Sequence, residues 1–121
     1  MAKTVLIVDD SPSMRAMVAS VLRDRGFEVI EGGNGKEALD RIAGRTISVV
    51  ITDLNMPVMD GIALIKALRA RPDFRFTPLL MLTTEAGQAR KQEGKAAGAT
   101  GWLVKPFNPE QLLGVIARVA A

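Results

Sequence analysis

The chain has 121 residues, of which 48% are hydrophobic and 24% charged, which is typical of one globular domain over residues 1–121 and excludes a disordered segment. It contains no cysteine and no histidine, which excludes disulfides, thiolate or imidazole metal ligands, a Ser-His triad and a catalytic histidine. Its net charge of +3 comes from scattered basic residues, so nucleic-acid binding is not expected. The absence of a long apolar run predicts a cytoplasmic protein without membrane insertion.

The first half of the chain alternates short apolar segments with segments of helical periodicity. Val5–Val8 predicts a strand. Ser11-Pro12 predicts the start of a helix that ends at Arg25, because serine caps helix N-termini and proline is favoured in the first turn. Glu28–Glu31 predicts a second strand, and a glycine-rich turn precedes a predicted helix over Lys36–Ala43.

The second half continues the same alternation. Ile47–Thr52 is apolar on both faces, which is typical of a central strand in a parallel sheet covered on both sides. The remaining predicted elements are a helix from Asp60-Gly61 to Ala70, a strand at Leu79–Leu82, a helix over Glu85–Ala97, a strand at Trp102–Val104 and a terminal helix capped by Asn108 and Gln111.

This strict alternation of strands and helices predicts the α/β class. Right-handed crossovers then give a parallel sheet with helices on both faces. In such folds ligands bind beyond the carboxyl ends of the strands. The residues that follow each strand are therefore the candidates for function.

Polar and charged residues stand at those positions. They are Asp9 and Asp10 after the first strand, Asp53 after the third, Thr83 after the fourth and Lys105 after the fifth. Taken singly, such residues are more often helix caps, turn residues or solvated charges. Together they predict a cleft in which three carboxylates repel one another unless a cation compensates.

The ligand chemistry of this set favours magnesium. Mg²⁺ binds oxygen ligands, keeps several waters and is often completed by a phosphate oxygen, whereas Ca²⁺ would require more protein ligands. The sequence therefore predicts a Mg²⁺ cofactor and a phosphate group in the substrate.

Four segments carry a family resemblance: VLIVDDSPSMR, VVITDLNMPVMDG, LLMLTTE and GATGWLVKPFNPEQL. In order and spacing they resemble response-regulator receiver domains over essentially the whole chain, and most closely the stand-alone regulators of chemotaxis. The resemblance implies a single-domain flavodoxin-like (βα)5 fold, with a five-stranded parallel sheet of order 2-1-3-4-5.

The resemblance also implies residue roles. It makes Asp53 the phosphoacceptor, Thr83 the switch hydroxyl and Lys105 the residue that contacts the phosphoryl group. The implied magnesium ligands are Asp10 and Asp53 directly, Asp9 partly through water, and the backbone carbonyl of Asn55.

Further positions are implied to control switching and phosphoryl lifetime. Trp102 occupies the place of the aromatic residue that moves inward when a receiver is phosphorylated, although tryptophan is larger than the usual residue there. Asn55, Thr84 and Glu85 are implied to tune dephosphorylation. Thr84 is bulkier than the residue common in the family, so slow self-dephosphorylation is expected. The family also implies a cis Lys105-Pro106 bond.

The implied function is a phosphorylation-activated signalling switch of a two-component system. The protein would accept a phosphoryl group from a histidine kinase of CheA type, dephosphorylate itself or meet a phosphatase, and perform no other enzymatic turnover. Its target would be a flagellar motor switch protein or another protein, and the basic residues Arg90, Lys91 and Lys95 favour an acidic partner segment. The alternatives are a phosphate sink, a phosphorelay receiver, or the receiver fragment of a DNA-binding response regulator.

Two other protein classes fit less well. A haloacid-dehalogenase-type phosphatase would carry an Asp-x-Asp motif after its first strand and a cap domain, and the sequence predicts neither. A flavin or nucleotide module would need glycines and bare amides where the sequence has VDDSPS.

Overall fold

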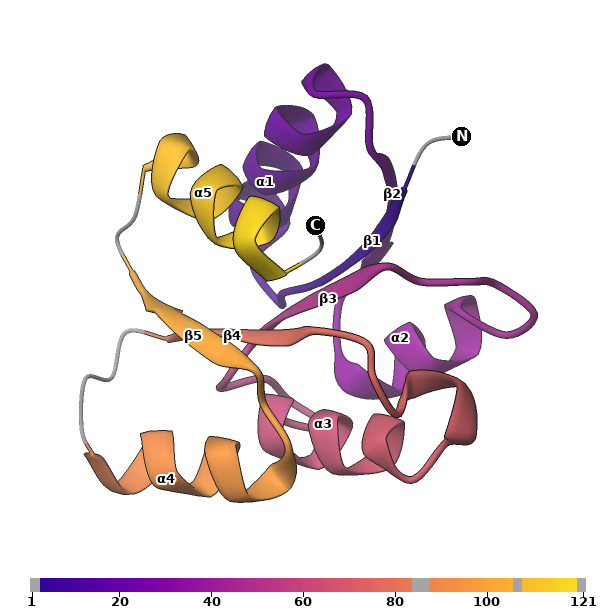
Figure 1. The fold of residues 1–121 in the computed structure, drawn as a ribbon, viewed down its shortest axis with the longest axis vertical. Coiled ribbons are helices and arrows are strands. Elements are labelled where there is room, and N and C mark those ends of the chain that lie inside the picture. Colours follow the sequence, from indigo (N-terminus) through magenta and orange to yellow (C-terminus); the bar gives the residue numbers. More distant parts are fainter. Residues whose placement is uncertain (1–2, 84–87, 106–107, 120–121) are drawn as a thin grey trace.

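The computed structural model describes residues 3–83, 88–105 and 108–119, and its elements alternate as predicted (Figure 1). The strands are Thr4–Val8 (β1), Glu28–Gly32 (β2), Val49–Asp53 (β3), Leu79–Thr83 (β4) and Gly101–Val104 (β5). The helices are Pro12–Asp24 (α1), Gly35–Arg41 (α2), Gly61–Arg69 (α3), the short 3-10 helix Pro72–Phe74 (η1), Gln88–Ala97 (α4) and Pro109–Val119 (α5).

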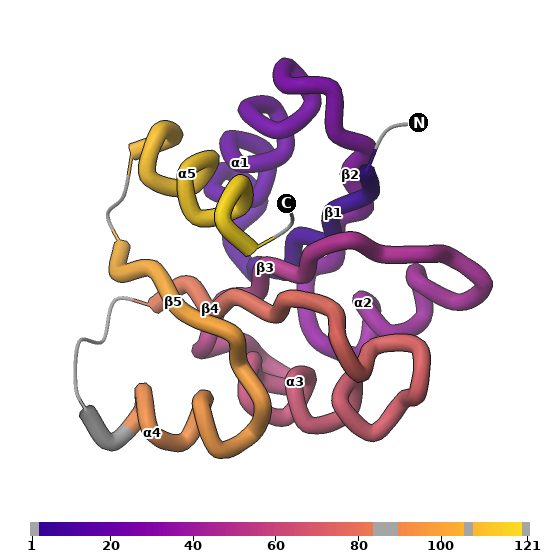
Figure 2. Tube along the Cα trace, in the orientation of Figure 1, coloured from indigo at the N-terminus to yellow at the C-terminus, as the bar shows by residue number. Residues whose placement is uncertain are grey.

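The sheet has five strands in the order β2-β1-β3-β4-β5, and all neighbouring pairs are parallel. Figure 1 shows α1 and α5 on one face and α2, α3 and α4 on the other. The trace in Figure 2 follows the chain through the same three layers. The predicted α/β class, the strand order and the helices on both faces are confirmed. Within the described part of the chain, no helix is long and apolar enough to span a membrane.

The apolar core is divided in two by the sheet. One cluster packs Val5, Ile7 and Ile51 of the strands against α1 and α5. The other packs the opposite faces of the same strands, with Leu6 and Val50 among them, against α2 and α3. The central position predicted for β3 is confirmed, because its residues are buried on both faces.

Polar side chains at the helix starts fix where each helix begins. The Ser11 hydroxyl accepts a hydrogen bond from the Met14 amide at 3.4 Å. The Asp60 carboxylate accepts one from the Ala63 amide at 2.8 Å. At the start of α5, the Gln111 amide donates to Asn108 Oδ1 at 2.8 Å. The Asn108 amide donates in return to Gln111 Oε1 at 3.0 Å, so the predicted reciprocal cap is confirmed.

Three strands, β2, β3 and β4, end one residue later than predicted. Asp53 pairs with Leu82 and Thr83 pairs with Val104, so both candidate residues are the last members of the hydrogen-bonded ladder rather than the first residues of loops. Their backbones are therefore held by the sheet. The predicted start of a helix at Glu85 lies outside the described residues.

Gly61 allows the loop of residues 54–60 to fold back tightly against β3. Its amide donates to the Leu54 carbonyl at 2.9 Å. A Cβ atom at this position would overlap the carbonyl oxygen of Asp53 and come within 3.1 Å of Leu54 Cα. The loop can therefore close beside Asp53 only with glycine at its end.

Gly61→Ala is expected to lower the free energy of unfolding by about 1–3 kcal/mol, because backbone atoms must shift to admit the methyl group. Urea unfolding measures this change. Gly114→Ala is the control: the space around Gly114 in α5 is open, so alanine there should raise stability by about 0.5–1 kcal/mol. Equal stability of Gly61→Ala and the unaltered protein would contradict the close approach.

Candidate functional site

The predicted site residues gather at the carboxyl edge of the sheet. Asp9 and Asp10 directly follow β1, Asp53 and Thr83 end β3 and β4, and Lys105 directly follows β5. Because all five strands are parallel and in register, these strand ends meet at the same edge.

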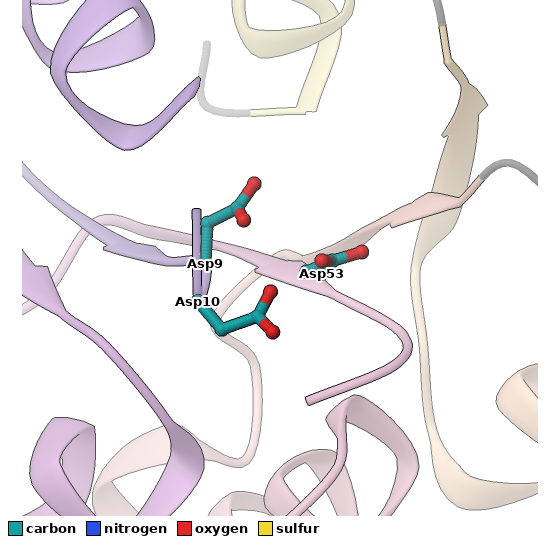
Figure 3. A group of neighbouring side chains, drawn as sticks. All are labelled: Asp9, Asp10 and Asp53. Carbon is teal, nitrogen blue, oxygen red and sulfur yellow. The ribbon is translucent and has the colours of Figure 1, made fainter. Parts of the chain in front are cut away.

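Three carboxylates form a cluster at this edge. Asp9, Asp10 and Asp53 each place a carboxylate oxygen within 4.8 Å of the others. Figure 3 shows the three side chains gathered beside one another. Asp9 is buried, Asp53 is partly buried and Asp10 is exposed. The cluster is therefore buried on the side of Asp9 and open to solvent on the side of Asp10.

Asp9 is held from several directions. Its Oδ1 accepts a hydrogen bond from the Ser11 amide at 2.9 Å, and its Oδ2 lies 3.2 Å from Lys105 Nζ. Its backbone amide donates to the Gly32 carbonyl of β2 at 3.1 Å, and its carbonyl accepts from Arg15 Nη1 at 2.7 Å. A carboxylate that is 1% exposed is stable only with such partners.

Lys105 contacts both the buried carboxylate of Asp9 and the partly buried carboxylate of Asp53. Its Nζ lies 3.2 Å from Asp9 Oδ2 and 3.3 Å from Asp53 Oδ1, and its side chain is only 13% exposed. Since β5 is two strands away from β3, roughly 10 Å separates the two strands, and the side chains of Lys105 and Asp53 bridge this gap together. Among charged side chains only a long one can do this, and the ammonium reduces the repulsion between Asp9 and Asp53.

The environment of Asp53 disfavours its charged form. Burial raises the pKa of Asp53 above its ordinary value of 3.8; the nearby Lys105 ammonium opposes this shift, and Asp9 adds to it. Hydrogen bonds from Lys105 and from the Leu54 amide, at 2.9 Å from Oδ1, also favour the carboxylate. A further cation at the cluster would stabilise the ionised form.

The donor set fits magnesium. Oxygens bonded at about 2.1 Å to one octahedral Mg²⁺ lie at most about 4.2 Å apart, so carboxylates already within 4.8 Å need to move only slightly. The exposed Asp10 leaves room for the waters that Mg²⁺ retains. Asn55 is exposed in the 54–60 loop, and the role implied for its carbonyl stays a prediction.

The remaining predicted residues are only partly placed by the structure. Thr83 is 2% exposed at the end of β4. Thr84, Glu85 and the Lys105-Pro106 bond lie at least partly outside the described residues. Their predicted roles therefore stay predictions.

Trp102 lies partly buried on β5 and packs against the core cluster that contains Met81, its neighbour on β4. The ammonium of Lys91 lies 5.3 Å from the centroid of its ring, a cation–π contact. A surface depression of about 380 Å³ beside it is lined by Lys95, Ala99, Thr100, Gly101 and Trp102. The basic face of α4 and the tryptophan therefore form one surface.

Arg15 is a site residue that the sequence did not reveal. Besides donating to the Asp9 carbonyl, it pairs with Glu31 of β2 at 3.3 Å and so holds the β1–α1 junction against the neighbouring strand. The available signal was its position near the start of α1, where the helix dipole disfavours a positive charge. An arginine in such a place indicates a specific partner.

Fold and site together define a CheY-like α/β domain, with an acidic cluster and a lysine at the carboxyl edge of a 2-1-3-4-5 sheet. The response regulator receiver domain family matches residues 5–117. The chain therefore belongs to the response regulator receiver domain family, and it is a receiver domain of two-component signalling.

Individual relatives agree with this assignment. Chemotaxis protein CheY1 of Helicobacter pylori is 41% identical over 110 residues, 89% of each chain. The structure of the chemotaxis response regulator CheY4 of Vibrio cholerae has a TM-score of 0.93 and 53% identity, covering 98% of this chain and 99% of that one. The predicted resemblance to receiver domains, and among them to the CheY proteins, is confirmed.

One structural relative is described with a metal ion. The receiver domain of the sensor histidine kinase PA1611 from Pseudomonas aeruginosa is described with a magnesium ion coordinated in its active-site cleft. It has a TM-score of 0.91 and 26% identity, covering 99% of this chain and 98% of that one.

Asp53→Asn is expected to stabilise the metal-free protein at pH 7. Because folding raises the pKa of Asp53, the stability that its protonated form contributes is present below pH 3.8 and is lost as the pH rises through the folded-state value. The neutral amide avoids that loss. Urea unfolding with a chelator, at pH 7 and at pH 3, measures the difference.

The stabilisation should be absent at pH 3 and should shrink when Mg²⁺ is added at pH 7, since metal binding stabilises the unaltered protein. A variant that is less stable than the unaltered protein in metal-free buffer at pH 7 would contradict the electrostatic description of the site.

Proposed function

We propose that this receiver domain, residues 1–121, is a cytoplasmic switch that takes a phosphoryl group onto Asp53 from a histidine kinase of CheA type. The observation that carries the proposal is the contact of Lys105 with both Asp9 and Asp53 inside a cluster of three carboxylates. The three carboxylates can hold a cation, and the ammonium lies beside them. A phosphoryl group, which is negatively charged, would be stabilised by both positive charges.

In the proposed reaction a carboxylate oxygen of Asp53 attacks the phosphorus of a phosphohistidine. A phosphorus–oxygen bond forms, the phosphorus–nitrogen bond breaks, and the partner's imidazole leaves. The Leu54 amide and Lys105 orient Asp53 through its Oδ1, and the Lys105 ammonium is placed to contact the transferred oxygens. Bound Mg²⁺, held by Asp9, Asp10, Asp53 and the Asn55 carbonyl, would neutralise charge on the phosphoryl oxygens.

Thr83 and Trp102 are proposed to convert phosphorylation into a new surface. The phosphoryl group adds negative charge and acceptor oxygens at the edge where the Thr83 hydroxyl lies. Movement of Thr83 would alter the packing that Trp102 makes on the adjacent strand. Because Lys91 contacts the tryptophan ring, the basic face of α4 would change with it.

A chemotaxis output is the proposed biological role, with a flagellar motor switch protein or another protein as target. The names of the curated relatives support this choice, and the basic residues Lys91 and Lys95 beside Trp102 favour an acidic partner segment. A phosphate sink, with a phosphatase or self-hydrolysis removing the group, is the second candidate. It would use the same site without a target.

Asp53→Asn is expected to reduce phosphorylation by phosphoramidate and Mg²⁺ to background, because the amide is a poor nucleophile. Intact-protein mass spectrometry detects the added phosphoryl group, and hydroxylamine lability identifies an acyl phosphate. Asp73→Asn, which alters an exposed aspartate in η1, is the control and should be phosphorylated normally. Undiminished acyl phosphate in Asp53→Asn would disprove the proposed acceptor.

Beryllium fluoride with Mg²⁺, a phosphoryl mimic, is expected to change the fluorescence of Trp102. This is the single tryptophan of the chain, so the signal reports one side chain. The physical cause is movement of the indole relative to Lys91 and Met81. Asp53→Asn should show no change, and an unchanged spectrum in the unaltered protein would exclude the Trp102 movement while leaving phosphorylation intact.

A further inference from the structure

Val58 has an unusual backbone conformation at an exposed position. Among the residues that the structure describes, it is the one non-glycine residue with positive φ, at 70°. The Met59 amide donates to the Pro57 carbonyl at 2.7 Å across it, so Val58 is the central residue of a γ-turn. Its side chain is 78% exposed.

Neither property benefits the isolated domain. A β-branched residue is disfavoured at positive φ because its Cβ atom crowds the backbone, whereas asparagine and glycine tolerate a positive φ better. Exposure also leaves an apolar side chain in water. Val58 belongs to neither apolar cluster of the core, so packing within the domain does not explain it.

The turn that carries Val58 forms part of the rim of the phosphoacceptor site. The 54–60 loop leaves β3 directly after Asp53 and returns to Gly61, which closes against the Asp53 carbonyl. Its other side is tied to the start of α2, because the Gly35 amide donates to the Met59 carbonyl at 3.3 Å. The loop is anchored at both sides of Val58, which holds this side chain outward at the rim.

We infer that Val58 is a docking residue for the phosphohistidine-bearing domain of the partner kinase, an inference that rests on the proposed function. A protein donor must bring its histidine within bonding distance of Asp53, so its surface must cover the adjoining rim. Covering Val58 would remove the exposed methyl groups from water, which is the benefit that the free domain lacks. The donor surface should therefore carry an apolar side chain close to its phosphohistidine.

A small phosphodonor reaches Asp53 without covering the rim, whereas a kinase domain must cover it. Comparing the two donors therefore tests the docking role of Val58. Phosphoramidate is compared with an autophosphorylated CheA-type kinase that phosphorylates the unaltered protein. Val58→Thr keeps the shape and the strained turn but replaces a methyl by a hydroxyl. Val58→Asn removes the apolar group and also relieves the turn. Phe76→Ser is the matched control, because Phe76 is 88% exposed in the loop that enters β4 at the opposite edge of the sheet.

Both Val58 variants are expected to lower kcat/KM for transfer from the kinase about fourfold or more, corresponding to loss of about one buried methyl, with the phosphoramidate rate unchanged. Phe76→Ser should change neither rate. Val58→Asn should raise Tm by about 3–5 °C and Val58→Thr should leave it unchanged, which separates relief of strain from loss of the apolar contact.

Three results would overturn the docking role: unaltered kinase transfer in both variants, equal slowing with both donors, or slowing in Val58→Asn alone. A defect confined to dephosphorylation by a phosphatase would likewise assign the residue to another partner. Failure of phosphoramidate to phosphorylate the unaltered protein would instead refute the proposed function, so the two failures are distinguishable.

Discussion

The contact of the Lys105 ammonium with Asp9 and Asp53 is the constraint on which the site depends. Two carboxylates with limited access to water, beside a third, would repel one another without a positive charge between them. Lys105 supplies that charge from the far side of β4. The compensation is partial, since burial still raises the pKa of Asp53. The negative charge that Lys105 leaves uncompensated explains why this edge of the sheet suits a divalent cation.

The rest of the fold keeps these groups in place. Asp53 is the last residue of the β3 ladder, so its position follows from register rather than from a loop. Asp9 is tied to β2 through the Gly32 carbonyl and to α1 through Arg15. On the open side, Gly61 lets the 54–60 loop close beside Asp53. The carboxylates and the lysine of the site are therefore held by the sheet and by the residues that directly follow its strands.

Much of this arrangement could be predicted from the sequence, because strand and helix periodicities differ and parallel strands bring their carboxyl ends together. The apolar run before Asp53 identified a central strand, and Ser11 and Asn108 marked helix starts. Arg15 could not be assigned, since its partner Glu31 is fixed only by pairing of β1 with β2. The positive φ of Val58 was also hidden, because valine itself disfavours that conformation.

The separation of 96 residues between Asp9 and Lys105 has a consequence for the life of the protein. A chain still emerging from the ribosome, or one cleaved before β5, already contains Asp9 and Asp53 but not the amine that contacts them. The complete cluster of charged groups can therefore form only after synthesis has passed β5.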